Sequence, residues 1–176
     1  MIECTANDVC AATESTLVCG TGEETLSGVA IDSRRVGERG LFVAFAGENV
    51  DGNDYVANAI AAGAGVVAVT REVTSDVEAA ALEAGCAIVR AADDDGTEFM
   101  LRLAEWWRAQ QDWCVVGVTG SVGKTTTKEM LAAALGAKYE VHATAGNFNN
   151  LIGVPITLLE APISAKVLVV EMGMNH

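Results

Sequence analysis

The sequence predicts an α/β protein with mostly parallel strands. Short apolar, β-branched runs alternate along the chain with alanine-rich stretches, a pattern typical of parallel sheets covered by helices. A glycine-rich segment at residues 117–123 lies between one apolar run and one helical stretch. Because 51% of the 176 residues are hydrophobic, the chain can also bury a substantial core.

The expected elements follow from these runs in order. Strands are predicted at the apolar, β-branched runs 29–32, 41–45, 66–70, 86–89, 114–119, 139–143 and 167–171. Helices are predicted over 55–62, 77–84, 98–110 and 125–135. Ser75 with Glu78 and Asp95 with Glu98 are expected to cap the starts of two helices. Tryptophans 106 and 107 are expected to pack their helix onto its neighbours.

The polar run at 92–96 is the expected domain junction. We therefore predict a small N-terminal α/β domain over residues 1–92 and the start of a P-loop-type parallel α/β domain over 93–176. The sequence stops directly after an apolar run, before a crossover helix could return to the sheet. The second domain is therefore expected to be incomplete and the chain to be part of a longer protein.

Composition excludes several classes of function. A formal net charge of −13 repels polyanions, so no nucleic-acid partner is expected. Basic residues cluster at Arg34, Arg35 and Arg39 and again at Lys124 and Lys128, where they either hold an anionic small molecule or simply face solvent. The five cysteines lack zinc spacing and are expected to be reduced. The chain has neither a membrane-spanning run nor a basic signal segment, so we expect a cytoplasmic protein.

Residues 114–127 place an apolar strand, a glycine-rich loop, Lys-Thr and a helical stretch in that order. Such a loop turns its backbone N–H groups inward around a phosphate, and the lysine reaches the terminal phosphates. The glycines fall at 117, 120 and 123, so a plain strand-to-helix turn or a dinucleotide site remains an alternative, although the fingerprint GxGxxG is absent. The expected nucleotide contacts are Gly120, Ser121, Val122, Gly123, Lys124, Thr125 and Thr126, with Thr125 also on magnesium.

Glu171 ends the last apolar run. In open α/β sheets, ligand-binding groups project from the carboxyl ends of strands. Glu171 is therefore a candidate magnesium ligand, and the alternative is a carboxylate that ends a strand in solvent.

Four segments resemble the Mur ligase family. GVTGSVGKTTTKEM at 117–130 is similar to its ATP loop, with the same shifted glycines, and 29–64 resembles its UDP-sugar-binding domain through Asp-Ser-Arg, Gly-x-Phe-Val-Ala and Asp-Gly elements. TAGNFNNLIGVPITLL at 144–159 and VLVVEMGMNH at 167–176 resemble the branch that adds D-alanyl-D-alanine. Three positions depart from the family pattern: Val122, Asn53 and Leu151.

The resemblance implies a monomeric ligase that uses ATP and Mg²⁺ to join D-alanyl-D-alanine to UDP-N-acetylmuramoyl-tripeptide through an acyl phosphate, in peptidoglycan precursor synthesis. It implies catalytic roles for Lys124, Glu171 and His176, with Thr125 and Glu171 holding the metal. The implied substrate contacts are Asp32, Ser33, Arg34, Gly47, Asp51, Gly52, Asn147, Asn149 and Asn175. The chain alone is expected to be inactive. The alternatives are a non-catalytic binding module for UDP-sugar or nucleotide, an unrelated P-loop kinase, and another Mur or folate-type ligase.

Overall fold

The computed structural model describes residues 1–47, 50–92 and 95–173 of the chain. The chain divides into two units, one formed by Ile2–Leu103 and the other by Met1 with Ala104–His176, and each has its own sheet and core. The division falls within helix α4 (Thr97–Ala109). The junction predicted at residue 93 lies outside the described residues and stays a prediction.

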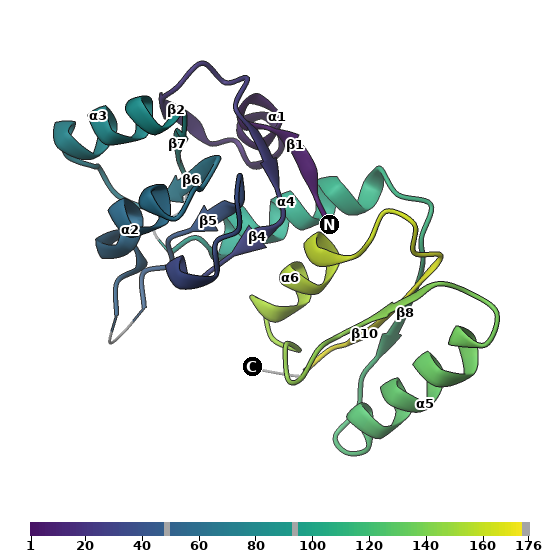
Figure 1. Cartoon of the computed structure of the whole chain (residues 1–176). Helices are drawn as coiled ribbons and strands as arrows, with labels where there is room; N and C mark the ends of the chain where they lie inside the picture. Colours follow the sequence, from purple (N-terminus) through teal and green to yellow (C-terminus); the bar gives the residue numbers. More distant parts are fainter. Residues whose placement is uncertain (48–49, 93–94, 174–176) are drawn as a thin grey trace. The chain divides into compact units, whose positions relative to one another are not determined.

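The unit Ile2–Leu103 is built on a five-stranded sheet with the order β2-β7-β6-β5-β4 (Figure 1). The strands β4 (Val29–Ala30), β5 (Leu41–Val43), β6 (Val66–Val69) and β7 (Ala87–Arg90) are parallel, and β2 (Thr16–Cys19) runs antiparallel to β7. Every side chain of β5 and β6 is buried, as expected of strands covered on both faces.

Helices α2 (Val56–Ala61) and α3 (Ser75–Ala84) pack against this sheet. Successive strand residues point to opposite faces, so alternate residues of each strand meet these helices. The shared core consists of Val36, Phe42, Ala44, Val56, Ala59, Ile60, Ala64, Val67, Val69, Ala81, Cys86 and Ile88.

The first part of the chain contains elements that the sequence patterns did not predict. The strand β1 (Glu3–Thr5) pairs antiparallel with β3 (Thr25–Ser27), and α1 (Ala6–Thr13) follows β1 directly. Thr5 and Asp8 form a capping box, in which the Asp8 N–H donates to the Thr5 hydroxyl at 3.2 Å and the Thr5 N–H donates to the Asp8 carboxylate at 2.9 Å. This capping box was the available sequence signal for α1.

The unit that contains Ala104–His176 has a three-stranded parallel sheet with the order β8-β10-β9. Its strands are β8 (Cys114–Val118), β9 (Val141–Ala143) and β10 (Val167–Glu171). Helices α5 (Lys124–Gly136) and α6 (Gly153–Glu160) lie on opposite sides of this sheet (Figure 1). The core on the α5 side contains Val116, Val118, Leu131, Leu135, Val141, Ala143, Val167 and Val169.

The predicted mostly parallel α/β fold class is confirmed, and each predicted strand and helix is present. Helix α6 was missed because a glycine and a proline stand at its start, although Pro155 is tolerated there since a first-turn residue needs no N–H partner. The predicted cap at Ser75 is wrong, because Ser75 is the first residue of α3 and Thr74 precedes it without a side-chain capping bond. Asp95 does accept a hydrogen bond, at 2.8 Å from the N–H of Thr97.

Trp107 is only 5% exposed, as predicted for a packing residue. All five cysteines are free thiols. Among the residues that the structure describes, no helix is both long and apolar enough to cross a membrane.

Gly153, the first residue of α6, leaves no room for a side chain. A Cβ atom at this position would lie 2.4 Å from the backbone carbons of Phe148, a contact that only a backbone shift could relieve. We expect Gly153→Ala to lower the free energy of unfolding of this unit by about 1–3 kcal/mol. Tryptophan fluorescence during urea unfolding reports on this unit, because Trp106, Trp107 and Trp113 all belong to it.

Gly136 provides the matched control, because a Cβ atom there meets nothing within 4 Å. We expect Gly136→Ala to leave stability unchanged or to raise it by up to about 1 kcal/mol. Equal effects of the two substitutions would show that the approach to Phe148 does not constrain the fold.

Candidate functional site

The glycine-rich loop connects β8 to α5. Gly120 and Gly123 have φ angles of 145° and 76°, values that side chains with a Cβ atom rarely adopt. Gly123 is the N-cap of α5 and offers no side chain to the first turn. The N–H groups at the start of α5 are therefore not capped by that residue, which leaves a suitable place for an anion.

Lys124 is held over the loop. Its Nζ atom donates a hydrogen bond to the carbonyl of Gly120 at 2.7 Å. Ser121, Thr125 and Thr126 are exposed at the same helix start. The side chain of Val122 is 87% exposed, so this position offers a ligand its backbone N–H rather than a packed side chain.

Glu171 is buried at the end of β10, with 2% of its surface exposed. Its Oε1 atom accepts a hydrogen bond from Nδ2 of Asn149 at 2.8 Å. Its Oε2 atom is buried and accepts no hydrogen bond from any residue that the structure describes. The alternative of a solvent-exposed carboxylate at a strand end is therefore wrong.

The surroundings of Glu171 favour its ionised form. The pKa of Glu171 lies below its ordinary value, chiefly because the Asn149 amide donates to the carboxylate. Burial acts in the opposite direction, and the Thr125 hydroxyl and the charges of Lys128 and Lys124 lower the pKa further. A buried negative charge with one free oxygen thus lies close to the loop residues.

The donor set fits Mg²⁺. A hard cation prefers oxygen ligands, and Mg²⁺ commonly binds one or two protein oxygens together with waters and phosphate oxygens. The free Oε2 atom of Glu171 and the nearby Thr125 hydroxyl meet that description. Within residues 1–47, 50–92 and 95–173, no group of three or more His, Cys, Asp and Glu side chains is arranged to hold a metal. A nucleotide would therefore have to supply part of the coordination.

Residues 147–150, the asparagine segment, contact Glu171 through Asn149. Asn149 uses its side chain on Glu171, and its carbonyl accepts the N–H of Gly173 at 2.6 Å. Asn147 is exposed. Asn175 and His176, both predicted site residues, lie outside the described part of the chain.

Two residues that sequence reasoning did not assign to the site also belong here. Lys128 donates to the carbonyl of Thr144 at 2.7 Å, and the Thr144 hydroxyl accepts the N–H of Glu171 at 2.9 Å. The sequence signal for Lys128 was its place beside the glycine-rich loop in an acidic chain. Thr144 carried no separate signal.

The predicted substrate residues of the other unit follow the carboxyl ends of β4 and β5. The Asp32 carboxylate accepts the N–H of Arg34 at 3.0 Å and the Nε and Nη2 groups of Arg34 at 2.9 and 2.7 Å. These bonds from Arg34 hold the pKa of Asp32 at about 2. Arg34 remains 86% exposed, whereas Ser33 is buried.

Asp51 and Gly52 have clear structural roles. Asp51 accepts two hydrogen bonds from Asn53, at 2.9 and 2.7 Å, and pairs with Arg71 at 2.9 Å. Asn53 also bonds Thr70 at the end of β6, so the turn is tied to the neighbouring strand. A Cβ atom at Gly52 would lie 2.8 Å from the backbone nitrogen of Phe45. Gly47 is exposed beside this turn.

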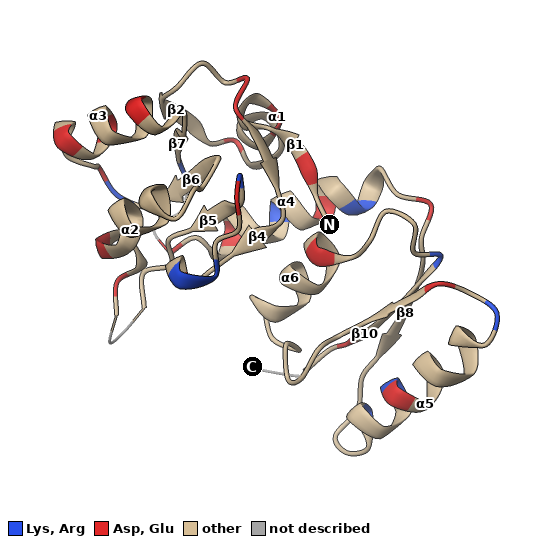
Figure 2. Ribbon diagram, in the orientation of Figure 1, with Lys and Arg blue, Asp and Glu red and all other residues tan. Residues whose placement is uncertain are grey.

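The charged side chains at the carboxyl ends of β4, β5 and β6 show which part of this sheet edge suits an anion. Figure 2 shows acidic residues on several helices and loops and a basic group at η1 (Ser33–Arg35), which carries Arg34 and Arg35. Arg71 contributes a further positive charge after β6, but it is shared between Asp51 and Asp54. The basic group at η1 is therefore the more available one.

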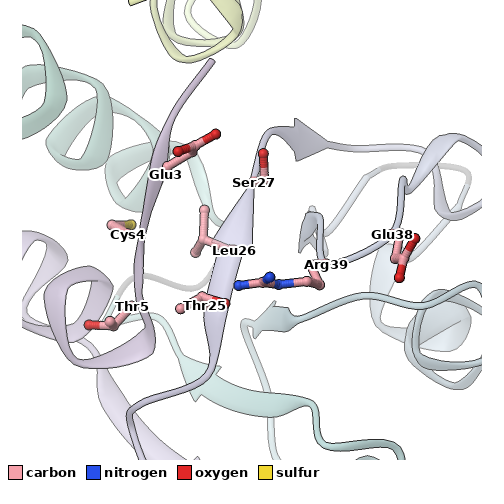
Figure 3. A pocket seen from close by; sticks show the side chains of 8 residues that line it. All are labelled: Glu3, Cys4, Thr5, Thr25, Leu26, Ser27, Glu38 and Arg39. Atoms are coloured by element: carbon pink, nitrogen blue, oxygen red, sulfur yellow. The ribbon is translucent and has the colours of Figure 1, made fainter.

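A separate surface pocket of about 640 Å³ lies beside β1 and β3 (Figure 3). It contains none of the predicted site residues, and it is lined by Glu3, Cys4, Thr5, Thr25, Leu26, Ser27, Glu38 and Arg39. Arg39 extends toward Thr25, while Glu38 points away from the other side chains (Figure 3).

Two protein-family models match this chain. The model of the Mur ligase family catalytic domain matches residues 25–111, and that of the Mur ligase middle domain matches residues 118–176. The chain is 38% identical over 176 residues to the UDP-N-acetylmuramoyl-tripeptide–D-alanyl-D-alanine ligase of Bacillus subtilis. That alignment covers 99% of this chain and 37% of the relative, so the chain spans little more than a third of the relative's length.

Solved structures show the same likeness. A crystal structure of MurF from Acinetobacter baumannii is 31% identical with a TM-score of 0.84, and the match covers all of this chain and 37% of that protein. MurF ligase from Thermotoga maritima, solved in complex with ADP, is 31% identical with a TM-score of 0.71 over 85% of this chain and 33% of its own. Since two models of one family together match most of the sequence and these structures share its fold, the chain belongs to the Mur ligase family.

Proposed function

We propose that this chain forms the UDP-sugar-binding part and the start of the ATP-binding part of a ligase that adds D-alanyl-D-alanine to UDP-N-acetylmuramoyl-tripeptide. The observation that carries the proposal is the buried Glu171 carboxylate, whose free Oε2 atom lies near Thr125 and the lysine of the loop. The relatives that carry this reaction in their names support the choice of substrates.

The loop residues have the chemistry for phosphoryl transfer. The N–H groups from Gly120 to Thr125 would surround the phosphates of ATP, and Lys124 would exchange its bond to the Gly120 carbonyl for one to a terminal phosphate oxygen. Glu171 and Thr125 would hold Mg²⁺, which neutralises charge on the phosphate oxygens. Asn149 keeps one oxygen of Glu171 occupied and so would leave the other for the metal.

In the proposed reaction, the tripeptide carboxylate attacks the γ-phosphorus of ATP, and ADP leaves. The resulting acyl phosphate is attacked by the amine of D-alanyl-D-alanine, which forms the amide and releases phosphate and the proton of the amine. These residues act by positioning the reactants and by compensating charge. Asn147, Asn175 and His176 are proposed on the side of the acceptor.

The unit Ile2–Leu103 is proposed to bind the UDP end of the sugar substrate. The support is the position of Asp32, Ser33 and Arg34 after a parallel strand, where ligands bind in open α/β sheets. Arg34 is exposed and lies beside Arg35, so it can meet a diphosphate with the Nη1 group that Asp32 does not occupy. Gly47 and the turn at Asp51 and Gly52 would shape the same edge.

The ligase reaction is tested through Lys124. In the complete protein that carries this chain, we expect Lys124→Ala to reduce amide formation about a thousandfold, because the substitution removes a charge that stabilises the transition state. Chromatographic detection of the ligated UDP-pentapeptide measures the rate. The matched control is Lys166→Ala, which removes one exposed positive charge outside the loop.

Near-normal ligation by Lys124→Ala would contradict the assignment of the loop.

We further expect the chain of 176 residues to bind substrates without ligating them, since the proximity of acceptor and acyl group is worth about 7–11 kcal/mol and needs both to be held. Substrate-dependent phosphate release by the chain alone at ordinary enzyme rates would show that it is a complete small enzyme.

Binding of the UDP end is tested through Arg34. We expect UDP to bind this chain with an affinity that falls with salt and that falls about tenfold or more in Arg34→Ala, since a hydrogen bond to a charged group contributes about 1.5–3 kcal/mol. Titration calorimetry measures both effects. Arg102→Ala is the control, because Arg102, which lies on α4, pairs with Glu14 and Glu98 instead. The same affinity with and without the Arg34 guanidinium would remove Arg34 from the site.

A further inference from the structure

Lys128 has an unusual environment for a lysine. It lies on α5, one turn after Lys124, and its side chain is only 2% exposed. Burial of an ammonium group is costly unless hydrogen bonds and charges compensate it. The compensating charge on its own helix is Glu129, at 2.9 Å, whose side chain is 67% exposed. A lysine needed only to fill the core could be replaced by an apolar residue at lower cost, so the position of its Nζ atom requires a further explanation.

The Nζ atom of Lys128 reaches the end of a neighbouring strand. It donates to the carbonyl of Thr144, the residue that follows β9, at 2.7 Å. The N–H of Thr144 donates to the carbonyl of Val169 at 3.0 Å and so extends the pairing of β9 with β10. Lys128 therefore fixes the orientation of a peptide group at the carboxyl edge of the sheet.

Thr144 passes this constraint to Glu171. The Thr144 hydroxyl accepts the N–H of Glu171 at 2.9 Å. Thr144 is itself 2% exposed, so water does not compete for these bonds. The path from Lys128 through Thr144 to the backbone of Glu171 thus consists of two buried hydrogen bonds, and no direct bond joins Lys128 to the Glu171 carboxylate among the described residues.

We propose that Lys128 is a positioning residue of the nucleotide site. Lys128 holds Thr144, and the Thr144 hydroxyl fixes the backbone of Glu171. The carboxylate that would receive Mg²⁺ is thereby held in place. The metal part of this inference rests on the proposed function, whereas the backbone part depends only on the hydrogen bonds of this chain.

The backbone part is tested by amide hydrogen exchange, measured by NMR on the chain of 176 residues. We expect Lys128→Met to speed exchange of the Glu171 amide about tenfold or more relative to the other amides of β10, because the Thr144 hydroxyl is no longer held. Lys128→Arg, which retains a charged donor, should restore most of the protection. Lys166→Met, which removes an exposed ammonium, should leave it unchanged.

If Lys128 only stabilises the fold, the exchange rate of the Glu171 amide should change in step with those of the other β10 amides or should not change at all. Either result would overturn the proposal. If Lys128→Met fails to fold, Lys128→Gln takes its place, because it removes the charge and shortens the reach while leaving a neutral donor. The exchange rate of the Glu171 amide is then compared with those of the other β10 amides in the same way.

The metal part is tested by titrating ADP into each variant with and without Mg²⁺. Loss of a residue that orients a metal ligand typically weakens metal binding about 10–100-fold. We expect Lys128→Met to weaken binding of Mg²⁺-ADP about tenfold or more and binding of metal-free ADP far less. Equal Mg²⁺-ADP affinity in wild type and variant would overturn the proposal. Failure of the wild type to bind any nucleotide would count against the proposed function instead, and hydrogen exchange would still decide whether Lys128 positions Glu171.

Discussion

The candidate site depends on the way in which the buried charge of the Glu171 carboxylate is compensated. A charge that is 2% exposed is unfavourable in a protein interior unless its surroundings compensate it. Here one oxygen is bonded to Asn149, the other accepts nothing among the described residues, and two lysines lie near enough to favour ionisation. The asparagine segment contributes to this compensation through Asn149, and α5 contributes through Thr125, Lys124 and Lys128.

The carboxylates of the other unit show a contrasting arrangement. Asp32 and Asp51 also follow parallel strands, but their oxygens are occupied by Arg34, Asn53 and Arg71 in exposed turns. Exposed ion pairs of this kind contribute little to stability; what they provide here is a defined turn shape. Asp51 therefore serves the fold more clearly than it serves a ligand, whereas Glu171 retains an oxygen that nothing in the described chain uses.

The sequence was most informative where one local pattern determined one structure. The order of strand, glycine-rich loop and helix placed Lys124 and Thr125 correctly at the start of α5, because strand and helix have different periods and glycine marks the turn between them. It was least informative for β1 and β3, whose residues Glu-Cys-Thr and Thr-Leu-Ser do not form an apolar, β-branched run. The bonds of Thr144 to Lys128 and Glu171 join residues 16 and 27 positions apart, and no spacing rule predicts such contacts.

We propose that Glu171 makes nucleotide binding depend on Mg²⁺. The most direct measurement is the affinity of this chain for ADP as Mg²⁺ is added, compared between the wild type and Glu171→Gln, which keeps the shape and removes the charge. The account predicts that Mg²⁺ strengthens ADP binding in the wild type and that this gain is lost in Glu171→Gln, while metal-free affinity changes little. The same gain from Mg²⁺ in both proteins would contradict it, because the metal would then be held without the carboxylate at the end of β10.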